Sequence, residues 1–249
     1  MLTIGSLFSG IGGFEYGLEA TGGFKVKWQC EINPFCWNIL HQNWPDAICY
    51  NDVNTILDST PAPDDVDIIT GGFPCQPVSV AGLKKGNEDA RWMWPQFLNV
   101  INYIHPKYVL IENVPNLLNL GMQEVLSGLW KSGYDAEWAV ISAAQFGAWH
   151  LRKRLWILAY PVCDGVQRTR FAHYLSETRA QGDIKGLSSW PGDWLPEAYS
   201  NSSANLALFS GKDDGLSPWV DQVKALGNSI VPNIPFWIGQ KILEFEREE

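Results

Sequence analysis

The 249-residue sequence lacks the long apolar runs that mark membrane proteins. No segment approaches the roughly 18 consecutive apolar residues that a membrane-spanning helix needs. The first residues have no basic stretch before their apolar run, so a secretion signal is not predicted and we expect a cytoplasmic protein without a membrane partner. With 46% hydrophobic and 18% charged residues, the composition is typical of a globular protein.

Cysteine and histidine are scarce and scattered. The five cysteines are an odd number without CxxC pairs, and the four histidines show no spacing typical of metal ligands. We therefore predict neither a disulfide framework nor a bound metal.

Positive charge is also in short supply, because the formal net charge is −9. Proteins that coat nucleic acid without specificity rely on Lys and Arg, so this balance argues against that class. One segment differs: residues 150–185 hold seven basic and three acidic side chains. Taken alone, that excess is most simply a solvated surface.

Apolar, β-branched runs alternate with helix-like stretches in the first 160 residues. The predicted strands are 2–8, 24–31, 66–72, 108–114 and 154–160, and the clearest predicted helices are 34–43 and 92–104. Alternation of this kind predicts an α/β fold with a mainly parallel sheet covered on both faces. We expect a catalytic and cofactor-binding domain over 1–160, a small irregular lobe over 161–215, and a C-terminal segment over 216–249 that returns to the first domain through a terminal helix.

A glycine turn follows the first predicted strand. The segment SLFSGIGGFE places Gly10, Gly12 and Gly13 before a helix, where bare backbone and an electropositive helix start suit a nucleotide or carboxylate. Glu15 stands where a dinucleotide fingerprint would have its third glycine, which argues against a nicotinamide enzyme.

Two acidic residues follow the next strands. Glu31 ends the second strand, where its carboxylate can accept hydrogen bonds from ribose hydroxyls, and Asp52 follows a third short strand, where it could meet an adenine amino group. The alternative is that both residues cap the elements that follow them.

Reactive groups follow three further predicted strands. Cys75 lies between two prolines in GGFPCQP, and Glu112 ends the strand of IENVPN, so thiol and carboxyl should share one sheet edge. Arg152 and Arg154 in HLRKR are two apart, so both guanidinium groups can aim at one target. The plainer alternatives are a buried structural cysteine, a helix cap and a pair of surface arginines.

This ordered set of motifs resembles the cytosine-C5 DNA methyltransferase family. SLFSGIGG is similar to its cofactor motif, GGFPCQ to its nucleophile motif, ENV to its third catalytic motif, HLRKR to its arginine motif and ALGNSIVP to its last motif. The resemblance covers roughly residues 1–160 and 212–245. It departs from the family at His150, where the arginine motif often opens with Gln, and the variable lobe is short.

The resemblance implies a Rossmann-like S-adenosylmethionine-dependent methyltransferase sheet with a small target-recognition lobe. It assigns Phe8 to the adenine, Glu31 to the ribose, Asp52 to the adenine edge, and Asn228 with Ser229 to closure of the pocket, beside the glycines Gly10 and Gly12. Around an extruded cytosine it would place the nucleophile, the proton donor and a guanidinium, which are Cys75, Glu112 and Arg154.

The implied substrate is double-stranded DNA and the implied reaction is methylation of cytosine C5, as in restriction-modification systems, by an enzyme we expect to be a monomer. The basic segment 150–185, with Arg152, would then face DNA, and the polar segment 79–91, with Lys84 and Lys85, would close on it.

Three other functions compete with this one. A branch of the same family methylates transfer RNA, but the CFTxxYxxY-type segment of that branch is absent from this sequence. A binding protein with dead chemistry is disfavoured because Cys75, Glu112 and Arg154 are all present. A dehydrogenase is disfavoured by the broken glycine fingerprint.

Overall fold

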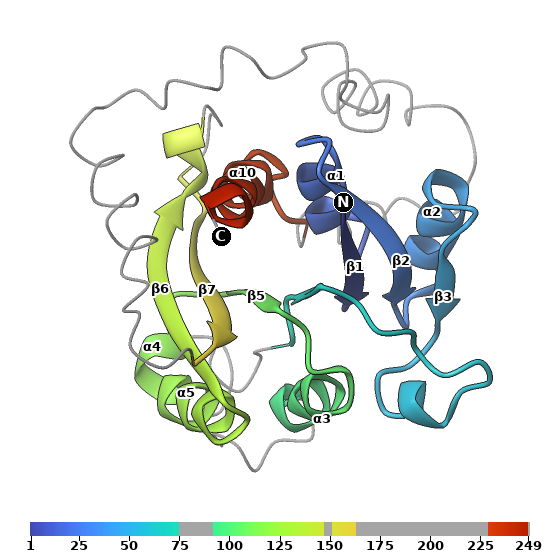
Figure 1. Cartoon of the computed structure of the whole chain (residues 1–249), viewed down its shortest axis with the longest axis horizontal. Helices are drawn as coiled ribbons and strands as arrows, with labels where there is room; N and C mark the ends of the chain where they lie inside the picture. Colours follow the sequence, from blue (N-terminus) through green and yellow to red (C-terminus); the bar gives the residue numbers. More distant parts are fainter. Residues whose placement is uncertain (75–91, 147–150, 163–228, 249) are drawn as a thin grey trace, which may run out of the picture.

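The computed structural model describes residues 1–74, 92–146, 151–162 and 229–248. These residues form one twisted sheet with helices on both faces (Figure 1). The strands are β1 (Leu2–Leu7), β2 (Phe24–Cys30), β3 (Ile48–Tyr50), β4 (Ile68–Gly71), β5 (Tyr108–Asn113), β6 (Tyr134–Ser142) and β7 (Lys153–Pro161). The α-helices are α1 (Gly13–Glu19), α2 (Pro34–Asn43), α3 (Trp94–Ile104), α4 (Leu117–Leu120), α5 (Met122–Lys131) and α10 (Asn233–Glu248). Two short 3₁₀ turns, η1 (Ile56–Asp58) and η4 (Ala143–Phe146), complete the described elements.

The sheet has the order β3-β2-β1-β4-β5-β7-β6. β1 to β5 pair in parallel, whereas β7 runs antiparallel to both β5 and β6. The predicted mainly parallel α/β sheet is confirmed. The strand order reverses beside β1, which has β2 on one side and β4 on the other, and open α/β sheets bind ligands outside such a switch point.

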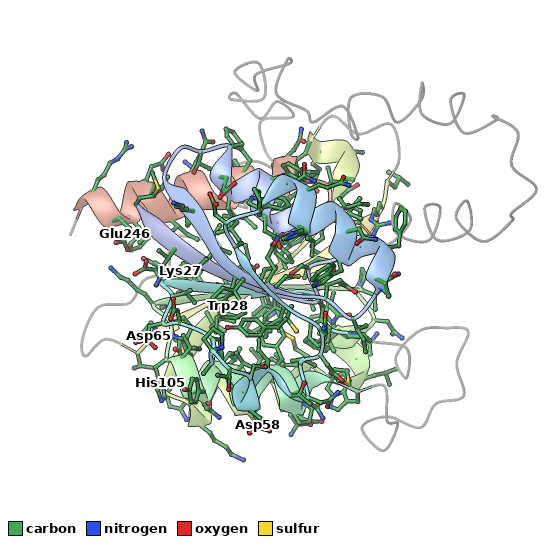
Figure 2. All side chains as sticks on the ribbon, turned by 90° about the vertical axis from the view of Figure 1, so that its right-hand side faces the viewer. Lys27, Trp28, Asp58, Asp65, His105 and Glu246 are labelled. Carbon is green, nitrogen blue, oxygen red and sulfur yellow. The ribbon has the colours of Figure 1, made fainter. Side chains whose placement is uncertain are left out.

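Two hydrophobic clusters hold the helices to the sheet. One lies on the face covered by α3 and α5 and contains the fully buried Trp28, at the centre of the molecule in Figure 2. Gly5 has room for no side chain, because an added Cβ would lie 2.1 Å from the Trp28 ring. The other cluster lies on the face covered by α1 and α10, where the rings of Phe14 and Trp156 meet edge to face at 5.6 Å.

The predicted helices 34–43 and 92–104 are both present in the structure. α2 spans the predicted residues 34–43, because Asn33 Oδ1 accepts a hydrogen bond from the Phe35 N–H at 2.9 Å and Pro34 takes the first helical position. α3 begins at Trp94, two residues later than predicted, with Pro95 in its first turn.

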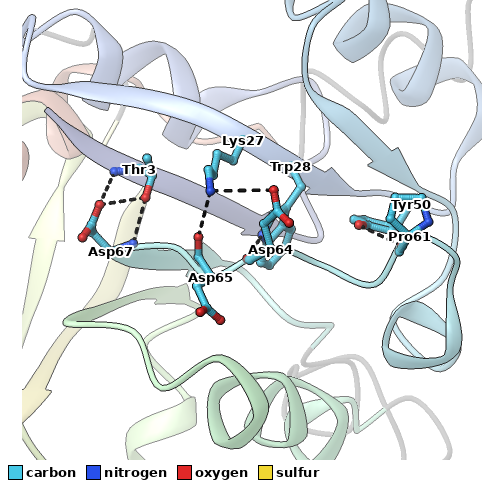
Figure 3. Close-up of polar contacts among 8 residues, drawn as sticks. All are labelled: Thr3, Lys27, Trp28, Tyr50, Pro61, Asp64, Asp65 and Asp67. Atoms are coloured by element: carbon cyan, nitrogen blue, oxygen red, sulfur yellow. Dashed lines mark hydrogen bonds and ion pairs between the residues drawn. The ribbon is translucent and has the colours of Figure 1, made fainter.

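The amino ends of the central strands are joined by a polar network (Figure 3). Asp67 Oδ2 accepts hydrogen bonds from the Thr3 N–H and hydroxyl, both at 2.7 Å. The Lys27 ammonium lies 3.7 Å from Asp64, whose carbonyl accepts a hydrogen bond from Trp28 Nε1 at 2.8 Å. These contacts fix the loop before β4 and leave the opposite, carboxyl edge of the sheet for a site.

Within the described ranges, no helix is long and apolar enough to cross a membrane. The same residues contain no cluster of His, Cys, Asp and Glu that could hold a metal ion.

Candidate active site

A pocket of ≈ 260 Å³ lies at the carboxyl ends of β1, β2, β4 and β5. It is the place where the strand order reverses, and it collects side chains that are far apart in the sequence. Its described lining consists of Phe8, Ser9, Gly10, Ile11, Gly13, Glu31, Asn33, Cys36, Gly72, Glu112, Ser229 and Ile230.

The glycine turn forms one wall of this pocket. Phe8 and Gly10 have φ values of 54° and 58°, in the left-handed region, so the chain turns sharply after β1. A Cβ at Gly10 would meet nothing within 4 Å, so the bare backbone borders open space. Gly12, with φ 88°, is not part of the described lining; a Cβ there would lie 2.4 Å from the Trp44 ring, so packing requires this glycine.

Glu31 ties the glycine turn to α2. Its Oε2 accepts a hydrogen bond from the Gly10 N–H at 2.7 Å, and its Oε1 accepts one from the Asn33 N–H at 2.8 Å. An ionised carboxylate has about four lone-pair sites, so Glu31 keeps acceptor capacity for hydroxyls that enter the pocket. The turn and the acidic strand end therefore meet, as the sequence predicts.

Asp52 is placed differently from Glu31. Its Oδ1 accepts hydrogen bonds from the Asn54 N–H at 2.9 Å and from Asn54 Nδ2 at 2.8 Å, which closes a tight turn after β3. Asp52 is not part of the described pocket lining, so its role toward adenine stays a prediction. Ser229, by contrast, lies in the lining.

Glu112 is a buried carboxyl at the end of β5, with a side chain that is 12% exposed. Burial raises its pKa from 4.5 to about 6, although Arg154 and Arg152 oppose that rise. Gly72 makes room for it, because a Cβ at Gly72 would lie 3.0 Å from Glu112 Oε2.

The two arginines lie at the start of β7, beside Glu112. Arg154 Nε is 3.0 Å from Glu112 Oε1, and Arg154 Nη1 donates a hydrogen bond to the Lys153 carbonyl at 2.9 Å. Burial lowers the pKa of Arg152, and the neighbouring Arg154 lowers it further. Carboxyl and guanidinium groups therefore converge on the pocket edge, as the sequence predicts.

The backbone that leads to the predicted nucleophile is held by Asn113, which sequence reasoning missed. Asn113 is buried; its Nδ2 donates a hydrogen bond to the Phe73 carbonyl at 3.1 Å, and its Oδ1 accepts one from the Val114 N–H at 2.9 Å. The only signal in the sequence was an amide next to Glu112 at an apolar strand end. Its partner is 40 positions away.

Some predicted site residues cannot be placed in this way. Cys75, Lys84, Lys85 and Asn228 lie outside the described residues, as does His150. Their roles stay predictions.

A glycine turn and an acidic strand end at a switch point are typical of an α/β protein that binds a cofactor with a nucleoside part. The family model of the C-5 cytosine-specific DNA methylases matches residues 2–204, so the chain belongs to this family. Enzymes of the family depend on S-adenosylmethionine.

Curated relatives are type II methyltransferases. M.HgiCII of Herpetosiphon aurantiacus is 31% identical over 185 residues, which cover 72% of this chain and 41% of that protein. M.AquIA of Picosynechococcus sp. is 30% identical over 215 residues, covering 78% of this chain and 86% of that protein. M.Sau3AI of Staphylococcus aureus is 34% identical over 174 residues, covering 62% and 42%. The match to M.HgiCII and M.Sau3AI thus spans about two fifths of their length.

Solved structures agree with the fold. The S. pombe Dnmt2 methyltransferase superposes with a TM-score of 0.57 at 27% identity, covering 71% of this chain and 56% of that one. A prophage-encoded DNA modification methyltransferase from E. coli gives a TM-score of 0.53 at 26% identity, covering 65% and 47%. The Rossmann-like methyltransferase sheet is therefore confirmed.

Proposed function

We propose that this chain transfers a methyl group from S-adenosylmethionine to carbon 5 of cytosine in double-stranded DNA, with Cys75 as the nucleophile. The family supports the reaction class. The observation that carries the proposal is the buried Glu112, paired with Arg154 at 3.0 Å on the edge of the pocket that the glycine turn forms.

The described lining suits S-adenosylmethionine in chemical character. Phe8 offers an aromatic face to the adenine, and the spare lone pairs of Glu31 suit ribose hydroxyls. Glu31 is acidic, and the cofactor carries a positive sulfonium and an ammonium group. Gly10 and Ser229 would border it, with Gly12 shaping the turn and Asn228 and Asp52 completing the set.

When bound, S-adenosylmethionine supplies an electrophilic methyl group. Cytosine C5 is too weak a nucleophile to accept it unaided, so the ring must first be activated. The Cys75 thiolate would do this by forming a bond to C6, which makes C5 electron-rich. After C5 has gained the methyl group, a base removes the C5 proton, the C6–sulfur bond breaks and the thiolate is regenerated.

Glu112 and Arg154 would stabilise the charge that develops on the ring. As sulfur adds at C6, electron density rises at N3 and O2, which are neighbouring positions. Glu112 in its protonated form can donate to N3, and Arg154 can donate to O2. Their contact in the structure sets these two groups side by side, which is how donors to N3 and to the oxygen on the adjacent C2 would have to lie.

A cytosine within a duplex must rotate out of the base stack to reach this pocket. Lys84, Lys85 and Arg152, with the basic segment 150–185, would hold the DNA phosphates. Residues 161–215 would form the target-recognition lobe and 216–249 would complete the domain of residues 1–160.

We further propose a monomeric, cytoplasmic protein; light scattering coupled to size-exclusion chromatography tests the oligomeric state.

Replacing the nucleophile tests the proposed function. Purified wild type, Cys75→Ser and the control Cys49→Ser are incubated with labelled S-adenosylmethionine and either duplex DNA or transfer RNA. Burial raises the pKa of the Cys49 thiol to about 12, so that thiol is unreactive and its loss should leave activity intact.

We expect wild type and Cys49→Ser to label duplex DNA, and Cys75→Ser to bind cofactor without labelling it. Methylation that survives in Cys75→Ser would refute the assigned nucleophile. Labelling of transfer RNA alone would refute the assigned substrate.

A further inference from the structure

Behind the glycine turn lies a buried acidic residue that the proposed reaction does not use. Glu15, in the first turn of α1, has no exposed surface. Its Oε1 accepts a hydrogen bond from Gln29 Nε2 at 3.0 Å. Gln29 is itself buried, and it is the β2 neighbour of Ser6 in β1. A polar cluster is thus enclosed between α1 and the sheet.

The surroundings of Glu15 favour its neutral form. Burial raises its pKa, and the groups that oppose the rise are hydrogen-bond donors rather than cations: first the Gln29 amide, then the Glu15 backbone, then the hydroxyls of Ser6 and Ser9. An ionised carboxylate buried without a counter-charge is costly, so this enclosure favours the protonated carboxyl over the carboxylate. A neutral carboxyl is both donor and acceptor, so Glu15 can pair with the Gln29 amide and with the two serine hydroxyls beside it.

Ser9 connects this cluster to the pocket, whose lining it shares with Gly10. The Ser9 hydroxyl lies 3.0 Å from Ser6 Oγ, and the Ser9 N–H donates to the Cys30 carbonyl at 3.2 Å. The Ser9 carbonyl accepts a hydrogen bond from the Gly12 N–H at 3.0 Å. The course of the glycine turn therefore depends on where Ser9 is held.

Gln29 connects the same cluster to the acidic wall of the pocket. It lies in β2, two positions before Glu31, whose carboxylate accepts the Gly10 N–H. The Glu15–Gln29 hydrogen bond thus joins α1, which begins at the glycine turn, to the strand that carries Glu31. This one buried hydrogen bond therefore connects the two walls of the pocket, which are the glycine turn and Glu31.

We propose that Glu15 is a positioning residue for the cofactor pocket: a fully buried carboxyl that fixes Gln29 on one side and the Ser6–Ser9 pair on the other. This inference rests on the proposed function, because it takes S-adenosylmethionine as the ligand. Glu15 does not touch the ligand; it acts through Ser9, Gly10 and Glu31.

The test measures S-adenosylmethionine affinity by isothermal titration calorimetry, and melting temperature, for four variants. Glu15→Gln keeps size and hydrogen bonding without a titratable group. Glu15→Leu removes the hydrogen bond to Gln29, and the double variant E15L/Q29L also removes the Gln29 amide that Glu15→Leu would leave without its partner. Thr70→Val is the control: Thr70 is buried beside Ser6 in β4, and its hydroxyl has no partner within the described residues.

We expect Glu15→Gln and Thr70→Val to bind within about threefold of wild type, because neither loses a hydrogen bond that holds the turn. E15L/Q29L should bind about tenfold or more weakly, even where its melting temperature matches wild type, because the hydrogen bond that joins α1 to the strand of Glu31 is lost. Glu15→Leu should bind at least as weakly, and if it fails to fold, the double variant decides.

If E15L/Q29L binds S-adenosylmethionine as tightly as wild type does, the inference is overturned, since the polar cluster would then only fill space in the core. Equal loss in Glu15→Gln would overturn the neutral positioning role. A wild type that does not bind S-adenosylmethionine at all would instead refute the proposed function, so the two failures are distinguishable.

Discussion

Glu112 is subject to two opposing influences. Its burial at the end of β5 favours a protonated carboxyl, whereas Arg154 at 3.0 Å favours the ionised form. Burial has the larger effect, and the pKa of about 6 keeps both forms accessible near neutral pH. A group that donates a proton to the ring and then recovers it needs this balance.

The pKa of Glu112 makes stability depend on pH. Because its pKa is raised from 4.5 to about 6, the folded protein binds the Glu112 proton more tightly than the unfolded chain does. This tighter binding stabilises the folded state fully below about pH 4.5, and the stabilisation is lost as pH rises through 6. The size of this contribution is about 2 kcal/mol. The contribution of Glu112 to stability can be measured by denaturant unfolding of wild type and Glu112→Gln at a series of pH values from about 4 to about 8.

We expect the free energy of unfolding of Glu112→Gln to rise by about 2 kcal/mol relative to wild type over that interval. Parallel curves would contradict the buried, proton-binding carboxyl. The same variant should lose about 10²- to 10⁴-fold in turnover, because an amide cannot transfer the proton.

Asn113 gives a second prediction. Asn113→Ala removes the hydrogen bond to the Phe73 carbonyl, so the backbone two positions before Cys75 should lose its fixed course. We expect kcat to fall by about tenfold or more, in line with the 1–3 kcal/mol of a lost buried hydrogen bond, with cofactor affinity unchanged.

The control for this prediction is Asn119→Ala, which removes an exposed amide in α4 whose partner is Asn116. Its kcat should match wild type. A cofactor affinity that falls together with kcat in Asn113→Ala would contradict the assigned role.

For single residues, the sequence predicts those that end strands and misses those that act through partners distant in the chain. Glu31 and Glu112 are predictable because parallel strands bring their carboxyl ends to one edge. Asn113 and Glu15 are not, because Phe73 and Gln29, their partners, are set by the fold and not by any local pattern. Asp52 shows the reverse: an acidic strand end that closes a turn instead of lining the described pocket.

Among the elements, α1 and α10 depend on close contact. α10 lies beside α1 on one face of the sheet (Figure 1). A Cβ at Gly17 would lie 2.3 Å from the Pro232 carbonyl oxygen, and one at Gly13 would lie 2.9 Å from the Ile230 Cβ and carbonyl oxygen. These glycines let the residues before α10, which include Ser229 and Ile230 of the pocket lining, rest directly on α1.

Gly13→Ala should therefore disturb the pocket through the backbone. The added methyl meets the backbone of Ile230, which has to move away from the pocket wall. Overpacking of this kind costs about 1–3 kcal/mol, so we expect cofactor affinity to fall by about tenfold. Calorimetric titration with S-adenosylmethionine measures this loss.

Gly128→Ala in α5 is the matched control. A Cβ there would lie 2.9 Å from the end of the Leu98 side chain, on the face of the sheet opposite α10. It should change stability without changing cofactor affinity. Equal losses in the two variants would show that the α1–α10 contact has no special bearing on the pocket.

The predicted elements match the structure where local signals are strong. α2 is predicted over its observed residues because Asn33 and Pro34 mark its start. β6 was not predicted, because it is an edge strand with half-exposed residues such as Glu137 and Trp138, which obscure any alternation of buried and exposed positions. The antiparallel direction of β7 also escaped prediction, since it depends on this hairpin.

In the molecule as a whole, the two edges of the sheet differ: one holds structural polar contacts and the other holds the pocket. Asp67, Asp64 and Lys27 join the amino ends of the strands (Figure 3), and the pocket occupies the carboxyl ends. The net charge of −9 limits nonspecific DNA binding, and the basic excess of residues 150–185 begins in sequence at the arginines beside Glu112.

Covalent trapping tests the central claim most directly. Duplex DNA containing 5-fluorocytosine has no C5 proton to lose, so the sulfur–C6 bond cannot be broken after methyl transfer. Incubated with S-adenosylmethionine, the protein should form a complex that survives denaturation, and peptide mapping should place the modified base on Cys75. The absence of such a complex with a cofactor-binding protein, or a base attached to another residue, would contradict the account.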